Sequence, residues 1–150
     1  YMGYDGGPVP DAEWNVRCDI PAAKKFLTSG VPIVLAGLDV TATVKYTEDW
    51  RTRLFGRRSP LTDAISGLYT LWAEDRMKPD PTLFDPVAVS MALGGGFVST
   101  RAAHVRVTDD GYTVLDETKP PNCSIGMHID RGAFLKWLTG RLVEQNLMRE

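Results

Sequence analysis

Cysteine is scarce in this chain, and the usual marks of a secreted or membrane-bound protein are missing. Two cysteines, Cys18 and Cys123, do not make a disulfide framework, and no Cys-x-x-Cys pair suggests a zinc site. A reducing compartment is therefore expected. No apolar run approaches the roughly 18 residues of a membrane-spanning helix, and the first residues lack a basic segment followed by an apolar one. We predict a cytoplasmic protein without a membrane partner.

An excess of one charge is also missing. The 17 basic and 19 acidic residues give a formal net charge of −2, which argues against a nucleic-acid partner bound through a broad basic surface. Hydrophobic residues make up 43% of the chain, enough for a packed core and too many for disorder. The length of 150 residues fits one domain of common size.

Helix and strand patterns alternate along the chain and predict an α/β fold. Asp19 can cap a helix over 19–30, and Gly30 can end it. The apolar, β-branched run 31–40 predicts a strand covered on both faces, typical of a parallel sheet. Asp39 lies near the end of that strand, where α/β sites gather. Structural bonding to a loop is the alternative role for Asp39.

The remaining elements are predicted from capping residues, periodicity and turn signals. Ser59 and Asp130 are expected to cap helices, and Asp110-Gly111 is a strong signal for a two-residue hairpin turn. We predict helices at 48–56, 59–77, 85–93 and 131–147, a hairpin at 102–118, a strand at 124–129, a loop at 5–12, and an extended or loop segment at 13–16.

Several polar residues have simple structural interpretations. Arg51, Arg53, Arg57 and Arg58 form a cluster that suggests either a phosphate-binding patch or, more simply, a solvated helix face. Cysteine often serves as a small packing residue, and this is the role we expect for Cys18 and Cys123. His104 and His128 are expected in strands or on the surface.

The first ten residues have the pattern of a segment inside a domain. "YMGYDGGPVP" places two large apolar residues before glycines and prolines, as where a strand runs into an active-site loop. We therefore expect the chain to be part of something longer.

Short motifs point to a family. They are "AEWN" at 12–15, an aspartate followed by Ala-Ala at 19–23, "LDVT" at 38–41 and "DPVAV" at 85–89. In this order they resemble the inosine-uridine preferring nucleoside hydrolases, from about residue 3 to residue 147. The resemblance implies a nucleoside hydrolase-like α/β fold, a Rossmann-like mixed sheet with flanking helices. Residues 1–150 would be its incomplete C-terminal portion, with the aspartate-rich N-terminal half absent.

The resemblance also implies an activity and a set of site residues. Family members hydrolyse the N-glycosidic bond of ribonucleosides with the help of calcium. Asp85 would bind the metal and the ribose, and Glu13 and Asn15 would contact the ribose. Two groups two residues apart point the same way in an extended segment, which suits a hydroxylated sugar. Tyr69 and Trp72 would stack on the base or, more simply, pack in the core.

Calcium needs more than Asp85. It takes six to eight oxygen ligands, and in the family most come from an Asp-x-Asp-x-Gly-x-Asp-Asp motif that this sequence lacks. In the implied mechanism calcium binds a water, an N-terminal aspartate takes its proton, and the hydroxide attacks C1′ through an oxocarbenium-like transition state. The chain alone is therefore expected to be inactive.

One position departs from the family pattern. Well-studied members have a histidine directly before the metal-binding aspartate, where it protonates a leaving purine. This chain has Phe84 there, and a hydrocarbon side chain cannot act as a general acid. The resemblance therefore does not fix the base preference.

Two interpretations of the whole chain remain. The first is part of a calcium-dependent nucleoside hydrolase. The second is a truncated, non-catalytic binding or oligomerisation module, with a homo-oligomer or the missing N-terminal half as partner. Such a module would expose a sheet face or edge. Asp85 before Pro86 also fits an ordinary helix N-cap, a role compatible with metal binding.

Overall fold

The computed structural model describes residues 11–75, 77 and 79–145. These residues fall into two compact units, one built from 11–44 and 83–129 and the other from 45–82 and the segment from 130 onward. Residues 1–10, with the predicted strand end and most of the predicted loop, lie outside the described residues.

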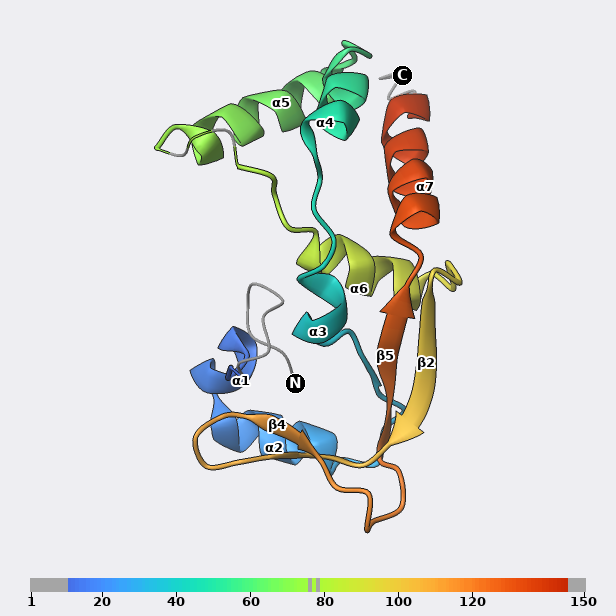
Figure 1. The fold of residues 1–150 in the computed structure, drawn as a ribbon. Coiled ribbons are helices and arrows are strands. Elements are labelled where there is room, and N and C mark those ends of the chain that lie inside the picture. Colours follow the sequence, from blue (N-terminus) through green and yellow to red (C-terminus); the bar gives the residue numbers. More distant parts are fainter. Residues whose placement is uncertain (1–10, 76, 78, 146–150) are drawn as a thin grey trace, which may run out of the picture. The chain divides into compact units, whose positions relative to one another are not determined.

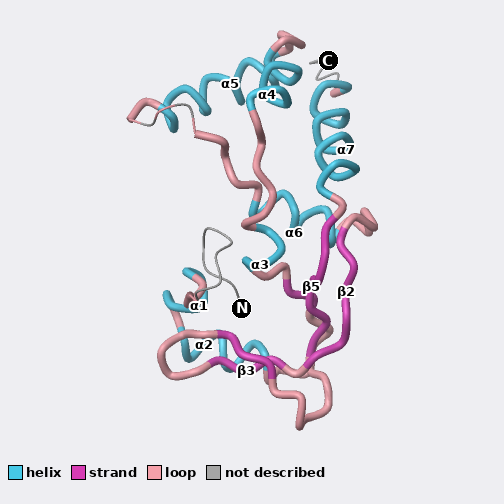
Figure 2. Tube along the Cα trace, in the orientation of Figure 1, coloured by secondary structure: helices cyan, strands magenta, loops and turns pink. Residues whose placement is uncertain are grey.

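A mixed sheet forms the centre of the first unit. Its strand order is β1-β5-β2, with β1 parallel to β5 and β2 antiparallel to β5 (Figures 1 and 2). The predicted strand at 124–129 is confirmed, whereas the strand before the hairpin was not predicted. The bounds are Val34–Leu35 for β1, Val98–Ala103 for β2 and Cys123–Ile129 for β5.

Four helices accompany this sheet and complete the α/β fold. The predicted cap of the helix that follows Asp19 is confirmed, because the Asp19 carboxylate accepts a hydrogen bond from the Ala22 amide at 2.9 Å. Val40 and Val87, each in one of the two later helices of this unit, are buried. The bounds are Trp14–Cys18 for α1, Ile20–Leu27 for α2, Leu38–Thr41 for α3 and Phe84–Ala92 for α6.

The segment 31–40 differs from its prediction. Only Val34 and Leu35 are in a strand, and the chain turns into α3 after Gly37. Asp39 lies in the first turn of α3, where a carboxylate is stabilised by the unpaired amides of the helix N-terminus. The side chain of Val34 is 59% exposed, so the prediction of a strand covered on both faces is wrong.

The segment 13–16 is helical rather than extended. Glu13 is the N-cap of α1, and its side chain accepts a hydrogen bond from the Val16 amide at 3.1 Å. A carboxylate that satisfies an orphan amide in this way favours a helix start over an extended strand. The expectation that Glu13 and Asn15 point the same way because they are two residues apart in an extended segment is therefore wrong.

The predicted hairpin is present with a different turn. It consists of β3 (Val105–Val107) and β4 (Thr113–Leu115). The Thr108 amide donates to the Tyr112 carbonyl at 2.9 Å, so three residues form the tip, and Gly111 has a φ of +86°. A left-handed residue at the end of a three-residue loop is a common alternative to the two-residue turn.

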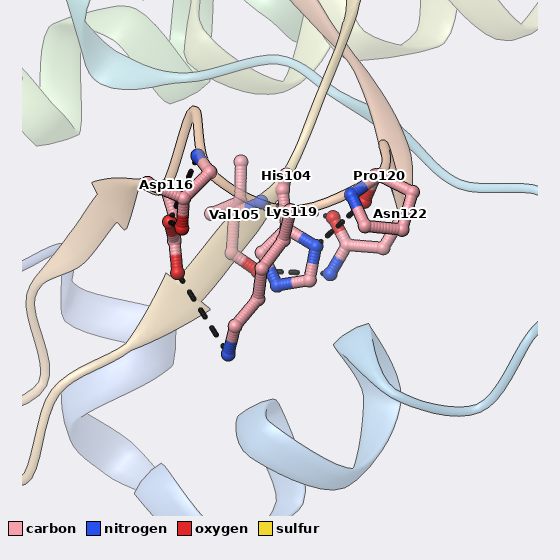
Figure 3. A network of polar contacts seen from close by, with 7 residues as sticks. His104, Val105, Asp116, Lys119, Pro120 and Asn122 are labelled. Carbon is pink, nitrogen blue, oxygen red and sulfur yellow. Dashed lines mark hydrogen bonds and ion pairs between the residues drawn. The ribbon is translucent and has the colours of Figure 1, made fainter.

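Asn122 fixes this hairpin to the rest of the unit. Its side-chain amide donates to the carbonyls of Val105 (2.9 Å) and Leu27 (3.1 Å), and its oxygen accepts from the Val105 amide at 2.9 Å. Nearby, His104 Nδ1 lies 2.8 Å from the Pro120 carbonyl (Figure 3). These contacts hold β3 against the end of α2.

The core of the first unit lies between α2, the sheet and the hairpin. Each buried member removes apolar surface from water, which is the main force that holds such a unit together. The cluster comprises Leu27, Ile33, Ala103, Val105, Val107 and Cys123. The packing role predicted for Cys123 is confirmed, whereas Cys18 is exposed and its predicted packing role is wrong.

The second unit is helical. Ser59 and Thr62 form a reciprocal capping box at its second helix, and the Asp130 carboxylate caps the last helix through the Ala133 amide at 3.0 Å, so both predicted caps are confirmed. The Tyr46 hydroxyl and the Thr139 hydroxyl are hydrogen-bonded at 2.9 Å in its interior. The bounds are Glu48–Phe55 for α4, Pro60–Ala73 for α5 and Arg131–Glu144 for α7.

Arg51 is a structural residue of this unit. It is 5% exposed, donates hydrogen bonds to the Tyr46 carbonyl and the Asp80 carboxylate, and lies 5.0 Å from the centre of the Tyr69 ring. The prediction of a solvated helix face is therefore wrong for Arg51, although Arg53 is exposed. Among the residues that the structure describes, no helix is both long and apolar enough to cross a membrane.

Candidate functional site

A cavity of about 560 Å³ lies within the first unit. Residues from α1, β1, α3, α6 and the β3–β4 hairpin surround it, together with two residues of β5. Such a volume is in the range of small-molecule sites, which cover roughly 300–1,000 Å³. The cavity is therefore large enough for a ligand of nucleoside size.

The three site residues predicted from the sequence line this one cavity. Glu13 and Asn15 come from the start of α1, and Asp85 comes from the first turn of α6. Asp39 of α3 lines the same cavity, as does Phe84 at the start of α6. Segments far apart in the sequence thus contribute side chains to one cavity.

Glu13 and Asn15 are joined directly. The Asn15 side-chain amide donates a hydrogen bond to Glu13 Oε1 at 3.0 Å, while Glu13 Oε2 accepts from the Val16 amide at 3.1 Å. The cap thus holds the Glu13 carboxylate, and the carboxylate in turn holds the amide of Asn15. The pair presents one acid and one amide group, a combination that can both accept from and donate to hydroxyl groups.

Asp85 is not the N-cap of its helix. The helix α6 begins at Phe84 with Leu83 as its cap residue, and Asp85 is the second residue of the first turn. The predicted N-cap role is therefore wrong. The Asp85 side chain is exposed, and an acidic residue in the first turn of a helix interacts favourably with the partial positive charge of the helix N-terminus.

Apolar side chains also line the cavity. Val34, Leu35, Val105, Leu115 and Ile125 contribute to it. Val34 and Leu115 line the cavity and yet are 59% and 47% exposed. These side chains offer hydrophobic surface in the same cavity as Glu13, Asn15 and Asp85.

The described residues do not form a calcium site by themselves. Glu13, Asp39 and Asp85 line the cavity, yet within the described ranges no group of three or more His, Cys, Asp or Glu residues is arranged to hold a metal ion. Calcium requires six to eight oxygen ligands. The carboxylates of this part of the chain can therefore supply only a fraction of such a shell.

The other candidates from the sequence lie elsewhere. Tyr69 belongs to the second unit. Its ring centre lies 5.7 Å from that of Phe55, and its hydroxyl donates to the Pro79 carbonyl at 3.3 Å. Tyr69 therefore has the packing role expected of it. Trp72 is in the same helix and is exposed. His128 is an exposed residue of β5, as expected.

Comparison with known proteins decides the family. The model of the inosine-uridine preferring nucleoside hydrolase family matches residues 2–136. The chain belongs to this family. The four motifs that suggested the family lie inside the matched range, and three of them, at 12–15, 38–41 and 85–89, contain residues of the cavity.

Individual nucleoside hydrolases support the assignment. The pyrimidine-specific ribonucleoside hydrolase RihA of Escherichia coli is 29% identical, over 91% of this chain and 49% of RihA. The putative pyrimidine-specific RihB of Shigella boydii is 28% identical, over 86% of this chain and 59% of RihB. This chain therefore spans about half the length of the curated relatives that it matches.

Solved nucleoside hydrolases share the fold. An inosine-guanosine nucleoside hydrolase superposes with a TM-score of 0.80 at 23% identity, over 97% of this chain and 50% of that protein. The purine-preferring ribonucleoside hydrolase of Gardnerella vaginalis gives a TM-score of 0.73 at 22% identity, over 88% of this chain and 46% of that protein.

Sequence reasoning assigned no cavity role to Trp14 or to the hairpin. Trp14 lines the cavity and is 69% exposed. Its position inside the "AEWN" motif was the available signal. Thr113 and Leu115 join the cavity only through the tertiary placement of β4, which no local pattern reports.

Proposed function

We propose that this chain forms one part of a ribonucleoside hydrolase that cleaves the N-glycosidic bond, and that its cavity holds the ribose. The observation that carries the proposal is the convergence of Glu13, Asn15 and Asp85 on one cavity of a nucleoside hydrolase family member. These three groups come from two family motifs separated by about seventy residues.

Glu13 and Asn15 are proposed to bind the ribose hydroxyls. The carboxylate of Glu13 retains acceptor capacity beyond its contacts with Asn15 and Val16, because each carboxylate oxygen can accept two hydrogen bonds. The Asn15 side chain adds a carbonyl acceptor and a second amide hydrogen. A sugar with vicinal hydroxyls can therefore donate to one residue and accept from the other.

Asp85 is proposed to contact the ribose and to supply one oxygen ligand of a calcium ion. Because the described residues lack the rest of the shell, the other ligands must come from polypeptide beyond them. When bound, such an ion acts as a Lewis acid and lowers the pKa of a coordinated water. Asp85 is exposed in the first turn of α6, so its carboxylate is accessible to a ligand.

The chain alone is proposed to be catalytically inactive. It spans about half of its curated relatives, and its described carboxylates do not assemble a metal site. The alternative is a non-catalytic binding or oligomerisation module. An apolar cavity wall with exposed Val34 and Leu115 favours that alternative as a second candidate.

Uridine is the first substrate to test. RihA and RihB are named for pyrimidine nucleosides, and Phe84 offers no proton to a departing purine. Inosine is the natural comparison, since solved relatives carry names that refer to inosine or purines.

The test uses a joined protein, defined as the segment of Escherichia coli RihA that this chain does not match, fused to residues 1–150. Ribose release from uridine and from inosine is measured with calcium and with a chelator. We expect calcium-dependent release from uridine. A joined protein that is folded by circular dichroism and monodisperse, but that releases no ribose from either nucleoside, would contradict the proposed function.

A further inference from the structure

Asp39 is a carboxylate of the cavity that the proposed function does not use. It lies in the first turn of α3, shortly after the strand β1, and it lines the cavity together with Glu13 and Asp85. Among the described residues, its half-buried side chain makes no hydrogen bond and no ion pair. Both of its oxygens can therefore accept hydrogen bonds from a ligand.

Gly37 makes room for this carboxylate. A side-chain carbon added at position 37 would lie 2.5 Å from Asp39 Oδ1, a separation that real side chains do not show. The backbone itself does not require a glycine, because Gly37 has a φ of −67° and a ψ of 158°, values that any residue adopts. What glycine provides here is therefore space for the Asp39 carboxylate.

The backbone of Gly37 is held in place. Its carbonyl accepts hydrogen bonds from the amides of Val40 and Thr41, each at 3.0 Å, and from the Thr41 hydroxyl at 3.2 Å. A larger side chain at position 37 would therefore displace the Asp39 carboxylate, which is the end of a rotatable side chain, rather than the backbone. Gly37 thus determines where Asp39 presents its charge.

The cavity has acidic side chains and no basic ones. Among the described residues that line it, Glu13, Asp39 and Asp85 are acidic, and none is lysine, arginine or histidine. A carboxylate accepts hydrogen bonds from hydroxyl groups and repels a phosphate group, which carries about −1.5 to −2 charges at neutral pH. Phosphate sites in proteins use arginine, lysine or helix N-terminal amides instead. The charge of this cavity therefore suits a neutral ligand with hydroxyl groups.

We infer that Asp39, held in place through Gly37, binds a hydroxyl group of the nucleoside and selects against phosphorylated ligands. The inference rests on the proposed function, since Asp39 lines the same cavity as the residues proposed to bind ribose. Calcium bound at Asp85 would offset the charge of that residue. Asp39 has no cationic partner among the described residues, so it is the carboxylate that distinguishes a nucleoside from its nucleotide.

Binding to the 150-residue chain tests the inference without cleavage. Nuclear magnetic resonance titrations follow the backbone amides of residues 13–15 and 37–41 with uridine and with uridine 5′-monophosphate. We expect uridine to shift these amides. The monophosphate should bind at least about tenfold more weakly, because its added negative charge meets an acidic cavity.

Substitutions at Asp39 separate its charge from its hydrogen bond. Asp39→Asn keeps one acceptor oxygen and removes the charge, so the preference for uridine over the monophosphate should fall to about threefold or less. Asp39→Ala also removes the acceptor and should weaken uridine binding by about fivefold or more. Asp110→Asn is the matched control, since Asp110 is an exposed acid of the same unit that does not line the cavity. It should leave both affinities unchanged.

Gly37→Ala tests the positioning role. Alanine can adopt the backbone conformation of Gly37, so this variant should melt within a few degrees of the parent chain. It should nevertheless weaken uridine binding about as much as Asp39→Ala does. Because both substitutions act through one carboxylate, the double variant should bind uridine no more weakly than Asp39→Ala alone.

Three results would overturn the inference. The first is a set of amides at 37–41 that uridine does not shift. The second is a preference for uridine over the monophosphate that is absent from the parent chain or that survives Asp39→Asn. The third is Gly37→Ala binding uridine as the parent chain does. Because these titrations involve no ribose release, failure here is distinct from failure of the joined protein to cleave uridine.

Discussion

At the scale of single residues, the Glu13 carboxylate has two partners and therefore two effects. It caps α1 through the Val16 amide and holds the side chain of Asn15. The motif that contains both residues was visible in the sequence, but their mutual hydrogen bond was not. It accompanies the helical start of α1, whereas the sequence suggested an extended or loop segment at 13–16.

Asp85 provides the sharpest single-residue prediction. In the joined protein, Asp85→Asn should lower calcium-dependent ribose release from uridine by about 100-fold or more, because a preorganised charge at a reacting centre is worth about 10²–10³ in rate. Steady-state kinetics measure the effect. Asp49→Asn is the matched control, since Asp49 is also exposed and also the second residue of its helix. Equal losses in both variants would refute a special role for Asp85.

The two cysteines should differ in reactivity. Burial raises the pKa of the Cys123 thiol, although a hydrogen bond involving Val105 opposes the effect, whereas Cys18 is exposed. Since the thiolate is the reactive form, we expect one thiol to react quickly with a disulfide reagent at pH 8 and the second only on unfolding. Cys18→Ser should abolish the fast phase. A fast phase that survives this substitution would show that Cys123 is accessible.

At the scale of elements, capped helices were predicted well and irregular segments were not. Asp19, Ser59 and Asp130 marked helix starts correctly because a side-chain cap is a local interaction. The division of 31–40 into β1 and α3 was missed because an apolar, β-branched run is compatible with a buried strand and with a short buried helix. Gly37 is the N-cap residue of α3 without a side-chain cap, and Val40 of that helix is buried.

The capping box of α5 gives a prediction about stability. Ser59→Ala removes one acceptor for the Thr62 amide, and loss of such a cap costs about 1 kcal/mol. Urea unfolding followed by circular dichroism measures the change. Ser66→Ala, in the interior of the same helix, is the control and should cost less. A Ser59→Ala variant as stable as the parent chain would show that the cap contributes little.

At the scale of the whole molecule, the sequence located the site residues but not the site. Motifs singled out Glu13, Asn15 and Asp85 one by one, and only the fold brings them to one cavity. The apolar wall from β1 and β4 could not be predicted, since Val34 and Leu115 carry no local signal beyond their strand pattern. The remaining ligands proposed for the metal ion could not be located from a local pattern either, because the ligands of one ion come from segments that are distant in the sequence.

The stability of the chain should fall at alkaline pH through Tyr46. Burial raises the pKa of this phenol above its ordinary value of 10.0, although the hydrogen bond to Thr139 and the charge of Arg53 oppose the effect. The unfolded state therefore loses its proton first, and stability decreases as the pH rises through about 10 and above. Urea midpoints at pH 8 and pH 11 should differ less for Tyr46→Phe than for the parent chain.

Tyr112→Phe is the control for the loss of a phenol. Tyr112 belongs to the first unit, whereas Tyr46 belongs to the second. The Tyr112→Phe variant should lose as much stability at pH 11 as the parent chain. If Tyr46→Phe declines in parallel with the parent chain, burial of Tyr46 is not the cause of the alkaline loss.

The most direct test of the central claim compares ribose release by the purified 150-residue chain and by the joined protein, with uridine and calcium at equal protein concentrations. The chain is proposed to hold only one wall of the site, since its described carboxylates do not assemble a calcium shell. The account predicts release by the joined protein and none by the chain. Calcium-dependent release by the chain alone would contradict it.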